Sequence, residues 1–376
     1  MFELNIRATK QINSLVKQSD VAISLVTVVN RGLSTIDKKV RTVALVDDSR
    51  ANTSGKKRLD DNVVKHLNTT LEELNPDVIH LHAPYSTPFA NIPILRKFRF
   101  LLDIYDPIYF YSRARLFNYR EISSERWLME NSVGFSTKFP EELYLEYSRS
   151  GYAIDGKPYL MFADYCAPQY FSNKDKIVDP YTLIYCGACD HAIVPKYFAG
   201  NNQFQEIFKS ILMENLNLEV YGSIFSGNQT SKLMNFEYYR LKNKYPSNFN
   251  LNGFVKQRDI QTRISKAGFG LQIHDFSRTG HHKIFGETSF GNKLFSYLEG
   301  GTPILVNEEL TWNARWVQEY NLGITFSLTK KVNIRALIDK IDYQELQKNI
   351  NSLRSNELSM DLNIKNLINF YHRISE

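Results

Sequence analysis

Two histidines and an aspartate stand where two apolar runs of the chain end. PDVIHLHAP at 76–84 is typical of a buried strand, and His80 and His82 lie near its carboxyl end. Side chains alternate along a strand, so both imidazoles belong to one face of a sheet. Asp106 ends the next run, FRFLLDIYD at 98–106, where its carboxylate could orient a hydroxyl group or accept its proton. Core histidines and an ordinary turn aspartate are the alternative interpretation.

A second group of residues suits an anion. NKLFSYLEGGTPILV at 292–306 predicts a helix, a tight turn and a buried strand, because Leu294, Phe295 and Leu298 have helical spacing. Backbone N–H groups at the start of a helix favour negative charge, and Lys293 stands in the first turn. The start of this helix can attract negative charge, with a solvated lysine as the alternative.

The loop before this helix is basic. SRTGHHKIFGETSFG at 277–291 contains Arg278, His281, His282 and Lys283 and follows the carboxyl end of a predicted strand. Binding residues are frequent on such loops. The loop suits a sugar nucleotide or an acidic sugar, and a solvated loop is an equal alternative.

The composition favours a globular cytoplasmic protein of more than one domain. The chain has 376 residues, of which 43% are hydrophobic and 23% charged. It lacks an apolar run of the roughly 18 residues that a spanning helix needs, and MFELNIRATK does not read as a signal peptide. Three cysteines are too few for a disulfide scaffold. Two of them form CGAC at 186–189, which has no second ligand pair for zinc and is not expected to be a redox site.

The net charge of +6 is concentrated in the first third of the chain, where about 18 Lys and Arg face about 12 Asp and Glu over residues 1–120. These basic residues include KKVR at 38–41, KKR at 56–58 and RKFR at 96–99. A solvated basic face and an attraction to an anionic membrane surface are both open interpretations. Nucleic acid is not expected, because no basic stripe is interleaved with aromatic residues.

Strand and helix patterns alternate along the chain, which predicts an α/β fold with two Rossmann-like, doubly wound parallel sheets facing a cleft. Residues 1–172 would form the first domain and 180–341 the second, with helices over 342–376 packing back on the first. Only a few residues precede a helix that begins near Ala8. The first strand of the first domain is therefore expected to be missing or truncated.

Several stretches, taken in order, resemble the GT-B glycosyltransferases, specifically family 4 and its relatives. They are PDVIHLHAP at 76–84, FADYCAPQYF at 162–171, LIYCG at 183–187, LEVYGS at 218–223, NLNGFVKQRDIQTRISKAGFGLQIHDFS at 250–277 and KLFSYLEGGTPILV at 293–306. The resemblance covers nearly the whole chain and is more specific to the fold than to the reaction. It implies an enzyme that takes a sugar from a nucleotide donor.

The resemblance also implies roles for particular residues. The donor diphosphate would lie at the start of the helix, near Asn292 and Lys293, and His82 would face the donor sugar or the acceptor. Asp106 is the second candidate catalytic residue. The full donor-binding set is Gly187, Lys196, Gly222, Phe254, Val255, Arg278, His282, Asn292, Lys293, Leu294 and Ser296.

Two carboxylates of the family are replaced in this chain. Counting back from the Gly-Gly-Thr-Pro corner places Thr288 and Ser296 at their positions, with Glu287 and Glu299 nearby. A hydroxyl group can bond to ribose, with less strength than a charged partner. A different donor, or loss of catalysis, is therefore possible.

The combined prediction is a hexosyltransferase-like enzyme that uses a UDP or GDP sugar and a glycan or lipid-linked acceptor. The resemblance implies retention of configuration, no metal and no cofactor, in bacterial-type surface polysaccharide or glycoconjugate synthesis. The enzyme would be cytoplasmic, with possible peripheral attachment at the inner face of the plasma membrane. A non-catalytic subunit that binds a partner transferase or a glycan is the main alternative. A sugar-nucleotide epimerase would want a cluster of cleft carboxylates, which the sequence does not show.

Overall fold

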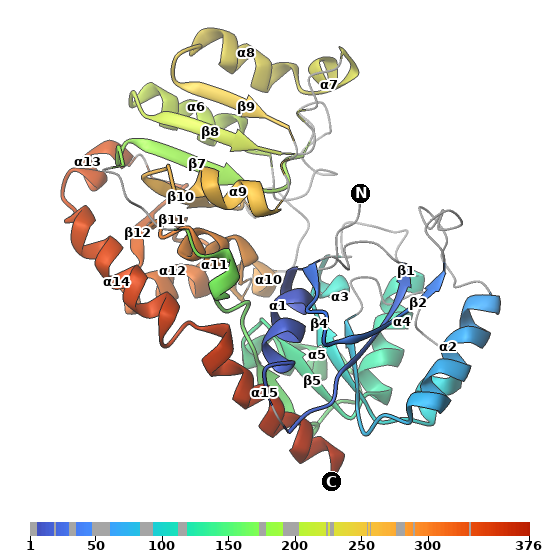
Figure 1. The fold of residues 1–376 in the computed structure, drawn as a ribbon. Coiled ribbons are helices and arrows are strands. Elements are labelled where there is room, and N and C mark those ends of the chain that lie inside the picture. The colour runs from blue at the N-terminus through green and yellow to red at the C-terminus, as the bar shows by residue number, and fades with distance from the viewer. Residues whose placement is uncertain are drawn as a thin grey trace. The chain divides into compact units, whose positions relative to one another are not determined.

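The computed structural model divides into two compact units, residues 1–164 with 360–376 and residues 165–359 (Figure 1). The expected domain bounds at 172, 180 and 341 remain predictions. The expectation about a first strand concerns residues 1–5, which lie outside the described residues. The structure describes residues 6–18, 20–29, 35–46, 61–82, 93–111, 119–172, 178–190, 203–222, 225, 229–253, 255, 257–275, 283–288, 290–330 and 332–376.

The second unit contains a six-stranded sheet in the order β12-β11-β10-β7-β8-β9, with every neighbouring pair parallel. The chain starts at β7, runs outward to β9, and returns to β10 on the other side of β7. The strand order therefore reverses between β7 and β10, and open α/β sheets bind ligands at the carboxyl ends of the strands on either side of such a point. The strands are β7 Thr182–Cys186, β8 Asn217–Tyr221, β9 Phe249–Asn252, β10 Phe269–Gln272, β11 Ile304–Asn307 and β12 Gly323–Phe326.

Helices flank this sheet, so its central strands are apolar on both faces, as parallel sheets require. Leu183, Tyr185, Phe269 and Leu271 are fully buried. The helices are α6 Gln205–Met213, α7 Gln229–Met234, α8 Phe236–Lys244, α9 Gln257–Ile264, α10 Lys283–Thr288, α11 Asn292–Glu299, α12 Thr311–Glu319, α13 Ile334–Ile338 and α14 Tyr343–Ser355, with a 3-10 turn at Pro168–Tyr170. The expected doubly wound parallel sheet is confirmed in this unit.

The first unit contains a four-stranded parallel sheet in the order β3-β4-β5-β6. Its strands are β3 Ile79–His82, β4 Phe100–Ile104, β5 Gly134–Thr137 and β6 Tyr159–Met161. The sequence predicted β3 and β4 but not β5 and β6, because GFST and YLM are too short to show a strand pattern. The predicted strands β1 (Ser24–Val29) and β2 (Arg41–Val46) pair with each other in a separate parallel sheet within the described residues.

The carboxyl-terminal helix of the chain belongs to the first unit, where it packs against α1. Ser14 Oγ donates to Asp361 at 2.6 Å, and Arg99 donates to the carbonyl of Ile374 at 3.0 Å. The helices of this unit are α1 Ile6–Leu15, α2 Asp61–Leu74, α3 Ile108–Tyr111, α4 Tyr119–Asn131, α5 Glu141–Arg149 and α15 Met360–Ser375, with a 3-10 turn at Pro93–Arg96. None of the helices that the structure describes is long and apolar enough to cross a membrane.

Candidate active site

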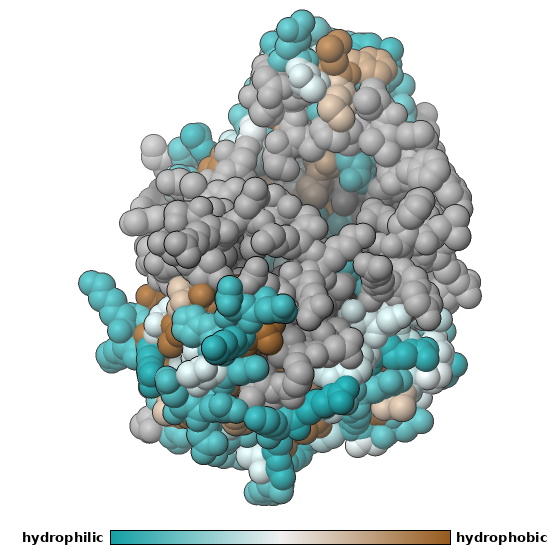
Figure 2. All heavy atoms as spheres, turned by 90° about the vertical axis from the view of Figure 1, so that its right-hand side faces the viewer, coloured by the Kyte–Doolittle hydropathy of each residue, from teal (hydrophilic) through white to brown (hydrophobic). Residues whose placement is uncertain are grey.

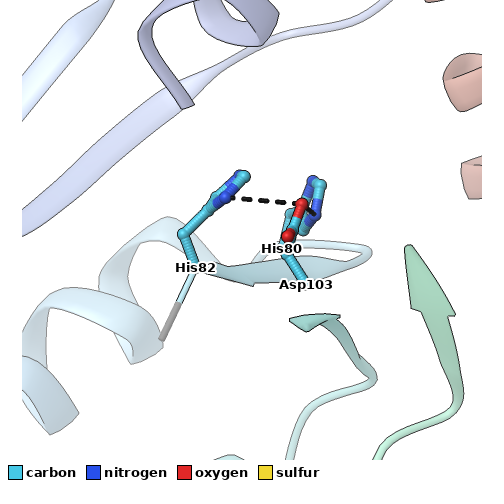
Figure 3. A group of neighbouring side chains, drawn as sticks. All are labelled: His80, His82 and Asp103. Atoms are coloured by element: carbon cyan, nitrogen blue, oxygen red, sulfur yellow. Dashed lines mark ion pairs between the residues drawn. The ribbon is translucent and has the colours of Figure 1, made fainter. Parts of the chain in front are cut away.

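The two histidines of the first unit meet an aspartate from the neighbouring strand. His82 on β3 lies in register with Asp103 on β4, and His80 lies on the same face of β3 (Figure 3). Oδ2 of Asp103 is 3.5 Å from Nε2 of His80 and 3.6 Å from Nδ1 of His82. The imidazole ring centroids are 4.2 Å apart. The parallel register thus places three polar side chains together at the carboxyl edge of the sheet.

A fully buried arginine from α1 holds the aspartate. Arg7 Nε donates to Asp103 Oδ2 at 2.9 Å, and its Nη1 donates to Asp164 Oδ1 at 2.8 Å and to the carbonyl of Phe162 at 2.6 Å. Burial alone would raise the pKa of Asp103, but Arg7 and the two histidines hold that pKa below its usual range. Asp103 is therefore a charged carboxylate in a buried ion triad.

His82 is a neutral imidazole at physiological pH. Burial, with smaller contributions from His80 and Arg7, lowers the pKa of His82 to about 3 despite the opposing effect of Asp103. A neutral imidazole can donate one hydrogen bond and accept another. His82 can therefore orient a bound hydroxyl group without carrying charge.

Asp106 follows β4 and lies near Lys138, which follows β5. Burial raises the pKa of Asp106, while Lys138 opposes that rise. A carboxylate with a raised pKa is better suited to accepting a proton than an ordinary surface aspartate. The aspartate that contacts His82, however, is Asp103, which sequence reasoning did not single out. The sequence feature that could have identified Asp103 is a single charged residue inside the otherwise apolar FLLDI strand.

In the second unit, helix α11 is fixed across the ends of two strands by one tyrosine. The Tyr297 hydroxyl donates to the carbonyl of Leu271 at 3.0 Å and accepts from the N–H of Cys186 at 3.2 Å. A Cβ at Gly270 would lie 2.3 Å from the Tyr297 ring, so glycine is required for this close packing. Tyr297 therefore joins α11 to β7 and β10, where the strand order reverses.

Lys293 lies one turn before Tyr297 and reaches the end of β7. A Cβ at Gly187 would lie 2.2 Å from Lys293 Cε, so the lysine stem rests on the Gly187 backbone. Lys293 Nζ lies 4.9 Å from the ring centroid of Tyr185. A Cβ at Gly222 would lie 3.3 Å from the carbonyl oxygen of Gly187. The structure thus brings together three residues of the predicted donor set: Gly187, Gly222 and Lys293.

Gln272 on β10, a buried glutamine that the sequence analysis did not single out, lies beside the start of α11. Gly291 caps the helix and donates its N–H to Asn313 Oδ1 at 3.1 Å. A Cβ at Gly291 would lie 2.2 Å from the side-chain nitrogen of Gln272, which is 1% exposed. Neither amide atom of Gln272 has a hydrogen-bond partner in the part of the chain that the structure describes. Its signal was a polar residue within the apolar GFGLQIH strand.

The other predicted donor residues differ in what they offer. Leu294 is fully buried, so only its backbone could contact a ligand, while Asn292 and Ser296 are half-buried. Buried Thr288 donates its hydroxyl to the Ile284 carbonyl at 2.6 Å. Val255 is half-buried. Outside the described residues lie Lys196, Phe254, Arg278, His281 and His282, and nothing is described of the Lys283 side chain.

Glu299, one turn beyond Ser296, has a structural place. It is fully buried and accepts hydrogen bonds from the N–H of Ala167 at 2.9 Å and from Gln261 Nε2 at 3.3 Å. The carboxylate of Glu299 thus makes hydrogen bonds within the second unit, which gives it a structural role.

The CGAC cysteines are both free thiols. Burial raises the pKa of Cys186 and of Cys189, and nearby Lys293 opposes the rise only in part. A protonated thiol is a poor nucleophile and a poor metal ligand.

Comparison with known proteins gives one family match. Residues 197–369, slightly less than half of the chain, match the family described as the C-terminal domain of glucosyltransferase 3-like proteins. Among curated protein sequences, none matches the chain.

Solved structures resemble the whole chain. WaaG, a glycosyltransferase involved in lipopolysaccharide biosynthesis, has a TM-score of 0.60 at 13% identity, over 98% of this chain and 97% of its own. MnaA from S. aureus, solved with UDP, has a TM-score of 0.54 at 14% identity, over 99% and 96%. UGT71G1 from Medicago truncatula, solved with UDP-glucose, has a TM-score of 0.51 at 11% identity, over 99% and 95%. These likenesses show the fold.

Proposed function

We propose that this chain, a glycosyltransferase of the GT-B fold, moves a sugar from a UDP-sugar donor to a glycan or lipid-linked acceptor. The fold and the carboxyl-terminal family match support sugar transfer. UDP is favoured because structural neighbours were solved with UDP or UDP-glucose. The observation that carries the proposal is the placement of Lys293 against Gly187 at the reversal of strand order.

In the proposed donor site, Lys293 and the start of α11 bind the diphosphate. The ammonium group supplies a full positive charge, and the helix end adds a partial one. Both interact more strongly as negative charge develops on the departing diphosphate, which is how a fixed charge accelerates such a step. A metal is not required for this stabilisation, so we propose that donor binding is metal-independent. Ser296 would supply a hydrogen bond where related enzymes use a carboxylate.

In the proposed acceptor site, His82 orients a sugar hydroxyl and Asp106 accepts its proton. The neutral state of His82 suits hydrogen bonding to an uncharged hydroxyl group. The raised pKa of Asp106 brings its basicity closer to what proton transfer needs. Retention of configuration, as the resemblance to family 4 implies, is part of the proposal.

We further propose that the enzyme acts on precursors of surface polysaccharides or glycoconjugates at the cytoplasmic side of a membrane. On the face shown in Figure 2, the described side chains are mostly hydrophilic, with small separate hydrophobic patches. The large hydrophobic side chains that are exposed among the described residues include Met213, Leu233 and Phe236. Leu233 and Phe236 lie close in sequence to Lys232 and Arg240, a combination that suits an anionic interface.

The first experiment is nucleotide binding followed by thermal unfolding. UDP, GDP, CMP and their sugars are each added in excess, because a ligand at about 100 times its Kd stabilises the folded state by about 2.7 kcal/mol. We expect UDP to raise the Tm of the wild-type chain, and Lys293→Met to remove most of the rise. Lys348→Met, a change at an exposed lysine on α14, is the matched control and should keep the full rise.

The two outcomes separate the candidate functions. A UDP-specific rise that depends on Lys293 supports the donor site, and hydrolysis or transfer of the sugar then identifies the reaction. Absence of a rise with every nucleotide would reject the transferase proposal in favour of a non-catalytic subunit. The replacement of two family carboxylates by Thr288 and Ser296 is the observation that keeps this second candidate.

A further inference from the structure

We propose that His80, His82 and Asp103 form a binding site for a divalent transition-metal ion of the Zn²⁺ type. Figure 3 shows the two imidazoles and the carboxylate gathered at one edge of the sheet of the first unit. One ligand atom of each residue lies within 4.8 Å of the other two. Two imidazole nitrogens and one carboxylate oxygen are a donor set that zinc accepts.

The two separations that involve Asp103 fit a tetrahedral ion. Zinc bonds to nitrogen and oxygen of about 2.0–2.2 Å place two ligands of a tetrahedron about 3.3–3.6 Å apart. The observed separations from Asp103 Oδ2 are 3.5 Å to His80 Nε2 and 3.6 Å to His82 Nδ1. These distances are longer than ordinary hydrogen bonds of about 2.7–3.2 Å. The contacts of Asp103 Oδ2 with the two histidines are therefore better spaced for a shared cation than for direct hydrogen bonds.

One nitrogen of His80 is placed to bind a cation. Its Nε2 is buried and has no hydrogen-bond partner among the described residues, although it faces a carboxylate oxygen. Its other nitrogen, Nδ1, lies 2.7 Å from the hydroxyl oxygen of Tyr371. When Nδ1–H donates to Tyr371, Nε2 carries a lone pair directed at another acceptor. In that tautomer, a cation between Nε2 and Asp103 Oδ2 would replace the repulsion by two favourable bonds.

The surrounding contacts match those of protein metal sites. A ligating histidine usually makes a hydrogen bond through its second nitrogen, and a ligating carboxylate is usually hydrogen-bonded as well. Tyr371 provides the first contact and Arg7 the second. The positive charge of Arg7 also competes with the cation for Asp103. We therefore expect weaker binding than in a fully anionic or three-histidine site.

The site goes beyond the proposed sugar transfer and can be tested without it. Three protein ligands leave a fourth position for water or a hydroxyl group, as in zinc sites that remain open. Coordination through Nδ1 of His82 leaves its Nε2–H available to donate to an acceptor. The proposed donor site lies in the other unit and does not need this ion.

The test is Zn²⁺ binding to the full chain after removal of bound metals with a chelator. Zn²⁺ is titrated in competition with a coloured chelator, and we expect one ion per chain with a Kd below about 100 µM, corresponding to more than about 5 kcal/mol of binding free energy. His80→Gln and His82→Gln should each weaken binding more than about 100-fold, since each removes a direct ligand. His372→Gln, an exposed histidine on α15, is the matched control and should bind normally.

The cysteines provide the competing explanation. Binding that survives both histidine variants but disappears in Cys186→Ser/Cys189→Ser would overturn the proposal, as would no binding up to about 100 µM. The X-ray absorption spectrum of the wild-type zinc complex keeps the test independent of how the variants fold. We expect only nitrogen and oxygen ligands at about 2.0–2.2 Å, and a sulfur ligand at about 2.3 Å would refute the site.

Discussion

Replacement of Gly187 by alanine should weaken nucleotide binding without changing any charged residue. The new Cβ would lie 2.2 Å from Lys293 Cε and 3.2 Å from Nζ. Ordinary carbon contacts begin near 3.4 Å, so the lysine stem must move by more than about 1 Å. The φ angle of +159° at Gly187 also disfavours a side chain. Lys293 would thus be displaced from the end of β7 while keeping its charge.

The size of the effect follows from the bond that is lost. A hydrogen bond between a charged lysine and a phosphate oxygen contributes about 1.5–3 kcal/mol, which corresponds to about 10–100-fold in Kd. Gly187→Ala should lose most of this amount, and Lys293→Met should lose all of it. Because both changes remove one interaction, the double variant should bind UDP about as weakly as Lys293→Met alone.

Calorimetric titration with UDP across the four proteins of this double-mutant cycle provides the measurement. Circular dichroism of each variant verifies that the fold is kept. Additive losses, with the double variant about tenfold or more weaker than either single variant, would show that Gly187 acts independently of Lys293. That result would refute the inference that Lys293 reaches the end of β7 because Gly187 has no side chain.

Three further predictions concern stability. Arg7→Met should lower the free energy of unfolding, measured in urea, by about 3–5 kcal/mol, because it leaves Asp103 and Asp164 buried without their cation. A loss below about 1 kcal/mol would contradict the buried triad. Tyr297→Phe should cost about 1–3 kcal/mol, because one buried N–H and one carbonyl lose their hydroxyl partner; an unchanged denaturation midpoint would show that α11 is held by packing alone. Burial raises the pKa of Glu125 from 4.5 to about 7, so the native state retains its proton more strongly than the unfolded chain and stability should fall by about 3 kcal/mol between about pH 4.5 and 7. Glu125→Gln should flatten this part of the pH profile, and an identical slope in the variant would assign it to other groups.

The polar cluster of the first unit shows where sequence reasoning stopped. HLH at 80–82 indicated two imidazoles on one strand face, and the structure places them there. Their carboxylate partner, Asp103, depends on the pairing of two strands that are separate in the sequence. Arg7 lies 96 residues from Asp103, and no local pattern connects a helix arginine to an aspartate at that separation.

In the second unit, one segment likewise has features that follow from the local sequence and contacts that depend on tertiary packing. The helix, turn and strand of 292–306 follow from side-chain spacing and from the turn residues, all of which act over a few positions. The contact of Lys293 with Gly187, and the position of Gln272 beside Gly291, depend on how α11 lies across the sheet.

The sequence by itself determined the alternation of strands and helices and the parallel α/β class, because periodicity and turn chemistry are local properties. Only the tertiary structure decided which polar groups share a site. It joined His82 to Asp103 and Arg7, and Lys293 to Gly187. These contacts arise from strand register and helix packing, which bring distant residues to the carboxyl ends of parallel strands and bury them there.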